Sequence, residues 1–171
     1  MSEAAAGAAS GRESSAWAVL GQVEDPEIPA LSLVDLGVIR FVRAQPGGVL
    51  EVGLSPTYSG CPATAVIRRS VEEALVREGL GPVTVMDVLA PAWTSDWISA
   101  EGRRKLTEYG IAPPSVAVAT ARQLLHGDRP AGCPRCGSTD SERVSEFGST
   151  PCKALYRCRG CLEPFEYFKC I

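Results

Sequence analysis

The chain has 171 residues, a formal net charge of −3, 45% hydrophobic residues and 22% charged residues. This length suits one ordinary domain with a small appendage, and the composition is that of a globular protein with a packed core. The charge excludes the concentrated basic surface that binding to nucleic acid or to an anionic membrane requires. No stretch has the run of about 18 apolar residues of a spanning helix, and MSEAAAGAASGRESS lacks the regions of a secretory signal, so we expect a cytoplasmic protein.

The first predicted elements are a disordered tail over residues 1–11 and a short helix over 12–24. In that helix Trp17 and Leu20 lie three residues apart on one face. The segments VIRFVRA and VLEVGL then alternate in hydrophobicity on either side of the turn sequence PGG. They predict a β-hairpin.

The next predicted helix spans residues 62–78, where Ile67, Val71 and Leu75 form an apolar stripe. A third strand is expected over 83–90. The sequence SDWISAEGRRKLTEYG then predicts a last helix that Ser95 caps. The resulting order, α-β-β-α-β-α, indicates an α/β fold with helices on one face of a small sheet.

The domain boundaries follow from the composition. The sandwich domain is expected over residues 12–112, a linker rich in turn residues over 113–131, and a cysteine-rich domain over 132–171. Within the linker, VAVATARQLL has the composition of a short helix.

Two Cys-x-x-Cys pairs carry the strongest chemical signal. Cys133 and Cys136 form the first, and Cys158 and Cys161 follow after 21 intervening residues. Two such knuckles complete a tetrahedral four-sulfur shell, so the segment is predicted to be a zinc ribbon. Protein ligands would fill all four positions, which indicates a structural metal; iron fits the same geometry, and buried or disulfide-bonded cysteines are the alternative.

Other residues of the ribbon admit two interpretations. Gly137 and Gly160 lie where the knuckle backbone turns tightly. Cys152 and Cys170 are either buried thiols that pack like small apolar residues or thiols with a redox or transfer role.

Cys61 is isolated from the other six cysteines, in the stretch PTYSGCPATAV. Pro62 is favourable as a first helical residue, so Cys61 is predicted at or next to the cap of the following helix, with Thr57 nearby as a hydrogen-bond donor. The positive end of a helix dipole stabilises a thiolate over a thiol. Cys61 is therefore a candidate metal-handling residue, and a buried inert cysteine is the alternative.

Three carboxylates are weaker candidates. Asp25 and Glu27 in DPE, and Asp35 in DLG, have the chemistry of ligands or bases, but both motifs are also ordinary turn and cap sequences. Trp93 and Trp97 admit either core packing or a partner-binding surface.

Several separated motifs carry a family resemblance. DPEIPALSLVDLG, PTYSGCPA and VLAPAWTSDWIS resemble the metal-sulfur cluster assembly domain of SufT-like iron-sulfur maturation factors. With CPRCGS and FGSTPCKALYRCRGCLEPFEYFKC, residues 15 to 171 resemble the PaaD (also called PaaJ) family of the phenylacetyl-CoA epoxidase system.

The resemblance implies an accessory, non-catalytic subunit in aerobic phenylacetate degradation. Its partners would be the di-iron oxygenase or the iron-sulfur flavin reductase, in which it helps to mature a metal centre. By the family motifs, Cys61 would handle iron or sulfur, with less defined duties for Asp25, Glu27 and Asp35, and the paired cysteines would bind zinc. One thiolate cannot hold a cluster alone, so a partner or a homodimer would supply further ligands. A non-catalytic scaffold of the epoxidase complex, with the ribbon as its docking module, is the alternative function.

Overall fold

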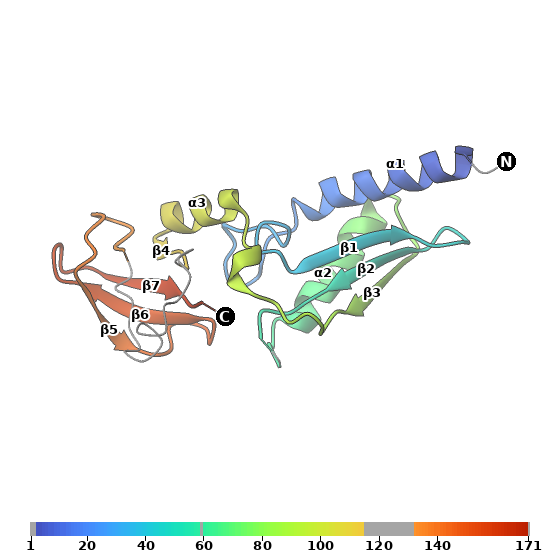
Figure 1. Ribbon diagram of the computed structural model, residues 1–171. Helices are drawn as coiled ribbons and strands as arrows, with labels where there is room; N and C mark the ends of the chain where they lie inside the picture. The colour runs from blue at the N-terminus through green and yellow to red at the C-terminus, as the bar shows by residue number, and fades with distance from the viewer. Residues whose placement is uncertain (1–2, 59, 115–131, 171) are drawn as a thin grey trace. The chain divides into compact units, whose positions relative to one another are not determined.

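The computed structural model describes residues 3–58, 60–114 and 132–170, with side chains from residue 11 onward (Figure 1). The chain forms two compact units, of which the first ends at Ser99 and the second begins at Ala100. Most of the predicted linker, including VAVATARQLL, lies outside the described residues.

The first unit has the predicted α/β character. Its elements are α1 (Glu3–Leu20), β1 (Ile39–Ala44), β2 (Leu50–Leu54), α2 (Thr64–Arg77), β3 (Val83–Asp87) and the 3₁₀ helix η1 (Ser95–Trp97). Helix α1 begins earlier than predicted, within the expected tail, because EAAAGAAS is rich in the strongest helix former, alanine. It ends at Leu20 rather than 24, where the backbone turns at Gly21.

The single helix predicted over residues 95–110 is wrong. Ser95 starts the short η1, in which Thr94 is the cap and accepts a hydrogen bond from the Asp96 amide. Ile98 then has an extended backbone, which interrupts the helix. The remainder forms α3 (Ala100–Tyr109), which belongs to the second unit.

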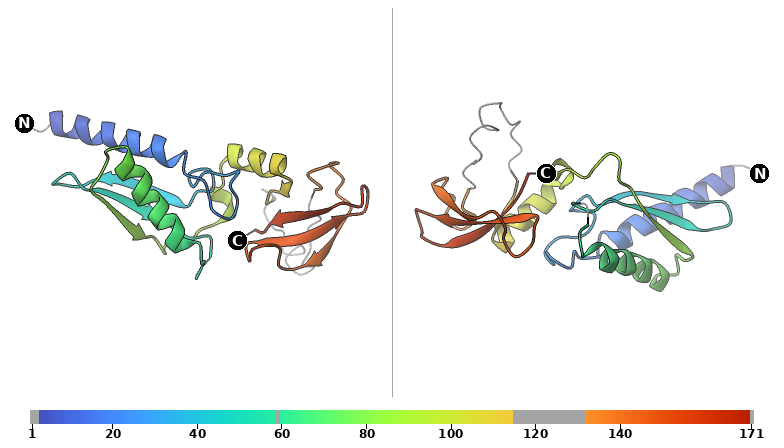
Figure 2. Two further views of the ribbon diagram at one scale, coloured as in Figure 1. Left: turned by 180° about the vertical axis from the view of Figure 1, so that it is seen from behind. Right: turned by 90° about the horizontal axis from the view of Figure 1, so that it is seen from below.

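The sheet of the first unit has the order β1-β2-β3, with β2 antiparallel to β1 and parallel to β3. Helix α1 packs against β1 and helix α2 against β3, and both helices lie along one side of the sheet (Figure 2). Every second residue of β2 is buried beneath them. The core comprises Leu20, Leu50, Val52, Leu54, Ile67, Val71, Leu75 and Val85.

A side chain from each helix occupies one backbone group on an outer edge of this sheet. The backbone N–H of Ala44 in β1 donates to Glu13 Oε1 of α1 at 2.8 Å. The backbone carbonyl of Val85 in β3 accepts from Arg68 of α2 at 2.5 Å. These groups point away from β2, so each contact removes a backbone group with which a foreign strand would pair.

The loop before β1 packs closely against the segment that follows β3, and we call this contact the interlock. Gly37 has φ +73°, and a Cβ atom there would lie 2.5 Å from the carbonyl oxygen of Trp97. Trp93 is buried and its Nε1 donates to the Leu36 carbonyl at 3.1 Å. The guanidinium of Arg40 lies 3.3 Å from the centroid of the Trp97 ring. Both tryptophans are thus engaged within the first unit, as the core-packing interpretation requires of at least one.

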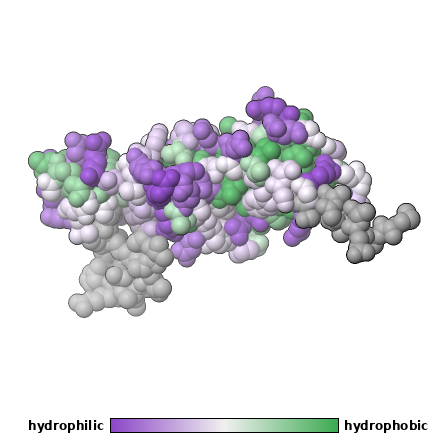
Figure 3. All heavy atoms as spheres, turned by 90° about the horizontal axis from the view of Figure 1, so that it is seen from above, coloured by the Kyte–Doolittle hydropathy of each residue, from purple (hydrophilic) through white to green (hydrophobic). Residues whose placement is uncertain are grey.

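The second unit is a small sheet with one helix. It contains α3, β4 (Ile111–Ala112), β5 (Ser141–Ser145), β6 (Lys153–Cys158) and β7 (Pro164–Phe168), in the sheet order β4-β7-β6-β5. One face of the sheet buries an aromatic cluster in which Tyr156 contacts Phe165 and Tyr167. Hydrophilic side chains gather over α3 (Figure 3), where Arg104 pairs with Glu101 and Glu108.

One ion pair of the second unit is largely buried. Lys153 is 3% exposed, and its Nζ lies 2.9 Å from Glu166 Oε2, whose side chain is 24% exposed. Glu166 Oε1 accepts a hydrogen bond from the Ser149 amide. Burial raises the pKa of Glu166, but the Ser149 amide and Lys153 outweigh it, so this pKa lies below its ordinary value.

Gly37→Ala is expected to destabilise the first unit, because the new methyl group clashes with the Trp97 backbone and also strains a left-handed φ. Gly47→Ala is the matched control, since Gly47 has φ +88° and nothing within 4 Å of an added Cβ. We expect the control to lose about 1 kcal/mol and Gly37→Ala to lose about 2 kcal/mol more. Urea unfolding followed by tryptophan fluorescence measures this, because all three tryptophans lie in the first unit. Equal losses would contradict the interlock.

Glu166→Gln is expected to destabilise the second unit by about 3 kcal/mol at pH 7, because it leaves the Lys153 ammonium buried without a counter-ion. Since the folded pKa of Glu166 is lowered, its stabilisation is present above the unfolded pKa of about 4.3 and is lost as the pH falls through the folded pKa. Hydrogen exchange of β6 and β7 should therefore differ between variant and wild type at pH 7 and converge in acid. The exposed Glu146→Gln is the control, and an equal effect there would contradict the pair's role.

Candidate functional site

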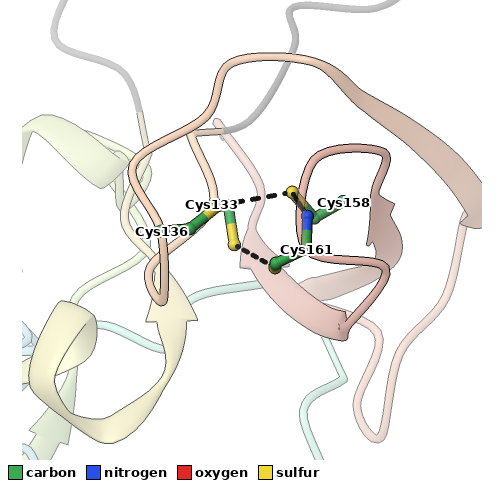
Figure 4. A group of neighbouring side chains, drawn as sticks. All are labelled: Cys133, Cys136, Cys158 and Cys161. Carbon is green, nitrogen blue, oxygen red and sulfur yellow. Dashed lines mark hydrogen bonds between the residues drawn. The ribbon is translucent and has the colours of Figure 1, made fainter.

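The four cysteines of the two knuckles meet in the second unit (Figure 4). The first knuckle precedes β5 and the second forms the turn between β6 and β7. All four sulfurs lie within 4.8 Å of one another. Cys133 Sγ is 3.7 Å from Cys161 Sγ, and Cys136 Sγ is 3.5 Å from Cys158 Sγ. A tetrahedral Zn–S bond of about 2.3 Å gives sulfur separations of about 3.8 Å, so the arrangement fits one such metal ion.

Backbone hydrogen bonds shape each knuckle. The Gly137 amide donates to the Cys133 carbonyl at 2.9 Å, and the Cys158 amide donates to the Glu163 carbonyl at 3.0 Å. Gly137 has φ +74°, as the predicted tight turn requires. Gly160 serves a different purpose, because a Cβ there would lie 3.3 Å from the Ser138 side chain. It lets the two knuckles pack closely.

The thiols differ strongly in acidity. The Cys161 amide donates to Cys158 Sγ and lowers the pKa of Cys158 to about 6. The Glu163 amide lowers the pKa of Cys161 as well, but burial and the neighbouring thiols outweigh it and raise that pKa to about 12. Four thiolates this close therefore coexist only with a cation among them. Since all four ligands come from the protein, the site leaves no open position for a substrate.

Cys152 and Cys170 lie apart from this four-sulfur group. Cys152 is buried and its Sγ lies 3.0 Å from Thr150 Oγ1, as expected for a packed thiol. Cys170 is exposed, which the interpretation as a buried thiol did not anticipate, and its Sγ lies 3.2 Å from Tyr167 Oη. Within the described part of the chain, the cluster that can hold a metal comprises only the four knuckle cysteines.

The candidate residues of the first unit gather at one end of its sheet. Leu54 pairs with Ile39 and with Asp87, so β2 and β3 end where β1 begins. The loops that contain DPE, DLG and PTYSGCP all adjoin this end. Carboxyl ends of parallel strands are the usual place for a site in a sheet of this kind.

Cys61 lies farther from the helix than predicted. Helix α2 begins at Thr64 and its N-cap is Ala63, so Pro62 is not the first helical residue and Cys61 is not the cap. Instead, the Cys61 carbonyl accepts from the Thr64 amide at 3.1 Å, which closes a turn ahead of the helix. The thiol is half-buried and free, and Thr57 is half-buried in the same loop.

Two of the three candidate carboxylates hold their own loops. Asp25 is 5% exposed, and its Oδ1 accepts from the amides of Glu27 and Ile28. Asp35 accepts from Ser32 Oγ at 2.9 Å and from Ser99 Oγ at 3.0 Å. This favours the turn and cap interpretation of DPE and DLG. Glu27 is half-buried beside Asp25. A ligand role for the three residues remains a prediction.

Leu162 is the feature of the ribbon that the sequence reasoning missed. It follows the second knuckle as Gly137 follows the first, and it has φ +67°, a conformation that costs a leucine about 1 kcal/mol. Its side chain is 62% exposed. Superposing CPRCG on CRGCL would have revealed that the second knuckle lacks the expected glycine.

Comparisons with known proteins agree with this architecture. Residues 13–86 match the family model described as "Iron-sulfur cluster assembly protein", and residues 117–169 match the "PaaD zinc beta ribbon domain". A crystal structure of a domain of unknown function, DUF59, from Bacillus anthracis has a TM-score of 0.55 and 25% identity, and covers 59% of this chain and 96% of that one. No helix among the described residues is long and apolar enough to cross a membrane.

A curated relative from Escherichia coli (strain K12) is named as the D subunit of a putative 1,2-phenylacetyl-CoA epoxidase. It is 50% identical over 157 residues, which is 91% of each chain. An identity of this extent covers both units and the segment between them. The chain therefore belongs to the PaaD family, the D subunits of the phenylacetyl-CoA epoxidase system.

Proposed function

We propose that this protein is a non-catalytic accessory subunit of a phenylacetyl-CoA epoxidase system that helps to mature the iron centre or iron-sulfur cluster of a partner. The recipient is the di-iron oxygenase or the iron-sulfur flavin reductase, in the cytoplasm. The relative's name supports the system. The observation that carries the maturation role is Cys61, a free, half-buried thiol at the sheet end of a domain that matches iron-sulfur assembly proteins.

The chemistry requires only ligand exchange. A thiolate is a soft ligand that binds iron well. Cys61 is the sole cysteine among residues 1–99, so the first unit contributes one thiolate and the recipient or a second copy supplies the others. Ligands of the recipient then displace Cys61 and any other donor thiolates, so that the ion or cluster passes to the recipient. Neither protein needs to be oxidised or reduced.

Cys61→Ser is expected to leave the fold intact, because the side chain is half-buried and a hydroxyl group has nearly the size of a thiol. Anaerobically purified wild-type protein should contain iron or acid-labile sulfide beyond its ribbon metal, and the variant should contain at least ten-fold less. A recipient produced with the variant should be short of iron. Cys170→Ser is the matched control, because Cys170 is also a thiol outside the knuckles. A fully metallated recipient in the Cys61→Ser strain would contradict the maturation role.

A scaffold function is the second candidate, and the carboxylates favour it. Asp25 and Asp35 accept hydrogen bonds from their own loops, and among the described residues of the first unit no group of three or more metal-binding side chains includes Cys61. A scaffold predicts that Cys61→Ser leaves both the recipient's iron content and epoxidase activity unchanged, while loss of the ribbon abolishes complex formation.

For the ribbon we propose one structural zinc ion. Cys136→Ser should lose this ion and unfold the second unit, because metal binding supplies about 10 kcal/mol to domains of this kind. The first unit should keep its native tryptophan fluorescence. Cys152→Ser is the control, since Cys152 is not a ligand. Elemental analysis distinguishes zinc from iron, and a coloured protein with one redox-active iron per chain would contradict the zinc assignment.

A further inference from the structure

Arg159 connects the two cysteine knuckles. It lies within the second knuckle, between Cys158 and Cys161, and its backbone amide donates to the Asp140 carbonyl at 2.9 Å. Its Nη2 donates to Glu142 Oε2 at 3.0 Å, and its Nη1 lies 3.8 Å from Asp140 Oδ1. Asp140 and Glu142 belong to the segment that follows the first knuckle. One residue of the second knuckle is therefore bound, through both its backbone and its side chain, to the chain of the first.

The arginines nearest to Arg159 do not make this connection within the described part of the chain. Arg157 lies opposite Glu142 in the register of β5 and β6, but its Nε donates to the Leu162 carbonyl at 3.4 Å, beside its own knuckle. Arg135 is exposed in the first knuckle and forms no ion pair with a described residue. Glu142 thus pairs with the arginine that lies inside the opposite knuckle.

The backbone already brings the charged groups of this connection together. An isolated exposed ion pair contributes little, because the cost of ordering two long side chains offsets the attraction. Here the Arg159 amide is bound to Asp140, and the adjacent residues Ser141 and Cys158 pair in the register of β5 and β6. Arg159 and Glu142 consequently start close to each other. This lowers the ordering cost and favours a measurable contribution.

The connection bears on access to the sulfurs. Cys133 and Cys158 are buried, one in each knuckle, whereas Cys136 is exposed. A competing ligand in solution reaches the buried sulfurs only after the knuckles have separated. Folded proteins open locally at a lower free energy than that of global unfolding. Contacts that join the knuckles therefore control this opening more directly than contacts elsewhere in the second unit.

We infer that Arg159, Asp140 and Glu142, which we call the knuckle latch, resist separation of the knuckles and so slow the extraction of the ribbon's metal ion. Arg159 is a positioning residue that acts through the cysteines of its own knuckle. Slow extraction suits a protein that is proposed to handle iron at Cys61, because it keeps the structural ion from exchanging with the cargo. The inference rests on the structural zinc ion proposed for the ribbon.

The test measures how fast excess EDTA removes zinc from the zinc-loaded full-length protein. Arg159→Gln should lose zinc about five-fold faster than the wild type, because two exposed ion pairs are removed. Arg135→Gln is the matched control, since it removes the same charge from the other knuckle. It should lose zinc at the wild-type rate. An equal acceleration in Arg135→Gln would mean that only the net charge near the metal matters, and it would overturn the latch.

Charge reversal provides a rescue experiment. Arg159→Glu should lose zinc at least ten-fold faster than the wild type, because three carboxylates then lie together. Adding Glu142→Arg restores an opposite pair and should bring the rate back to within about three-fold of the wild type. Since salt screens exposed charges, the wild-type rate should approach that of Arg159→Gln at about 1 M salt. A double variant as fast as Arg159→Glu contradicts the pairing.

Glu166→Gln separates the latch from the general stability of the second unit, because it removes an ion pair outside the knuckles. It should leave the extraction rate within about two-fold of the wild type. If it accelerates extraction as much as Arg159→Gln does, release follows unfolding of the whole unit and the latch is overturned. If Arg159→Gln loses zinc at the wild-type rate, the latch fails and the zinc ion stands. If the wild type holds no zinc, the zinc assignment fails and the latch with it.

Discussion

The fold of the second unit depends on how the negative charge of its four clustered cysteine sulfurs is neutralised. Four sulfurs lie within 4.8 Å of one another, and the acidities of Cys158 and Cys161 are driven far apart when no cation separates them. A divalent cation bound at this site would remove the repulsion and join two knuckles that are distant in sequence. The rest of the unit is helix α3 and a short sheet with a small aromatic cluster. We therefore expect the arrangement of the two knuckles to depend on a bound metal.

The fold of the first unit positions three loops that carry the candidate site residues. Its strands and helices bring DPE, DLG and the Cys61 turn to one end of the sheet. Asp25 of DPE and Asp35 of DLG accept hydrogen bonds that stabilise the surrounding loops. Asp35 accepts from Ser99, and Gly37 admits the Trp97 backbone, so the loop before β1 and the segment after β3 stabilise each other. Cys61 is held by a turn whose shape does not depend on its thiol. The thiol of Cys61 is therefore available to bind a ligand without a change in the turn.

Much of this was predictable from the sequence, because periodicity and cysteine spacing are local signals. The hairpin, α2 and the four-cysteine set were found in this way. Strands β4 and β5 were not, since Ile111–Ala112 is only two residues long and SERVS has no apolar alternation. The break between η1 and α3 depends on the extended backbone of Ile98, which no propensity encodes. The place of Cys61 was missed by a few residues because proline is favourable in a turn as well as at a helix start.

The side chains on the outer edges of the first sheet bear on whether copies of this protein associate through that sheet. An open strand edge is a template for pairing with another copy of the same chain. Glu13 and Arg68 each occupy one backbone group on an outer edge with a charged side chain of the chain itself. The same two side chains that join each helix to the sheet therefore also make pairing between the sheets of two copies less favourable.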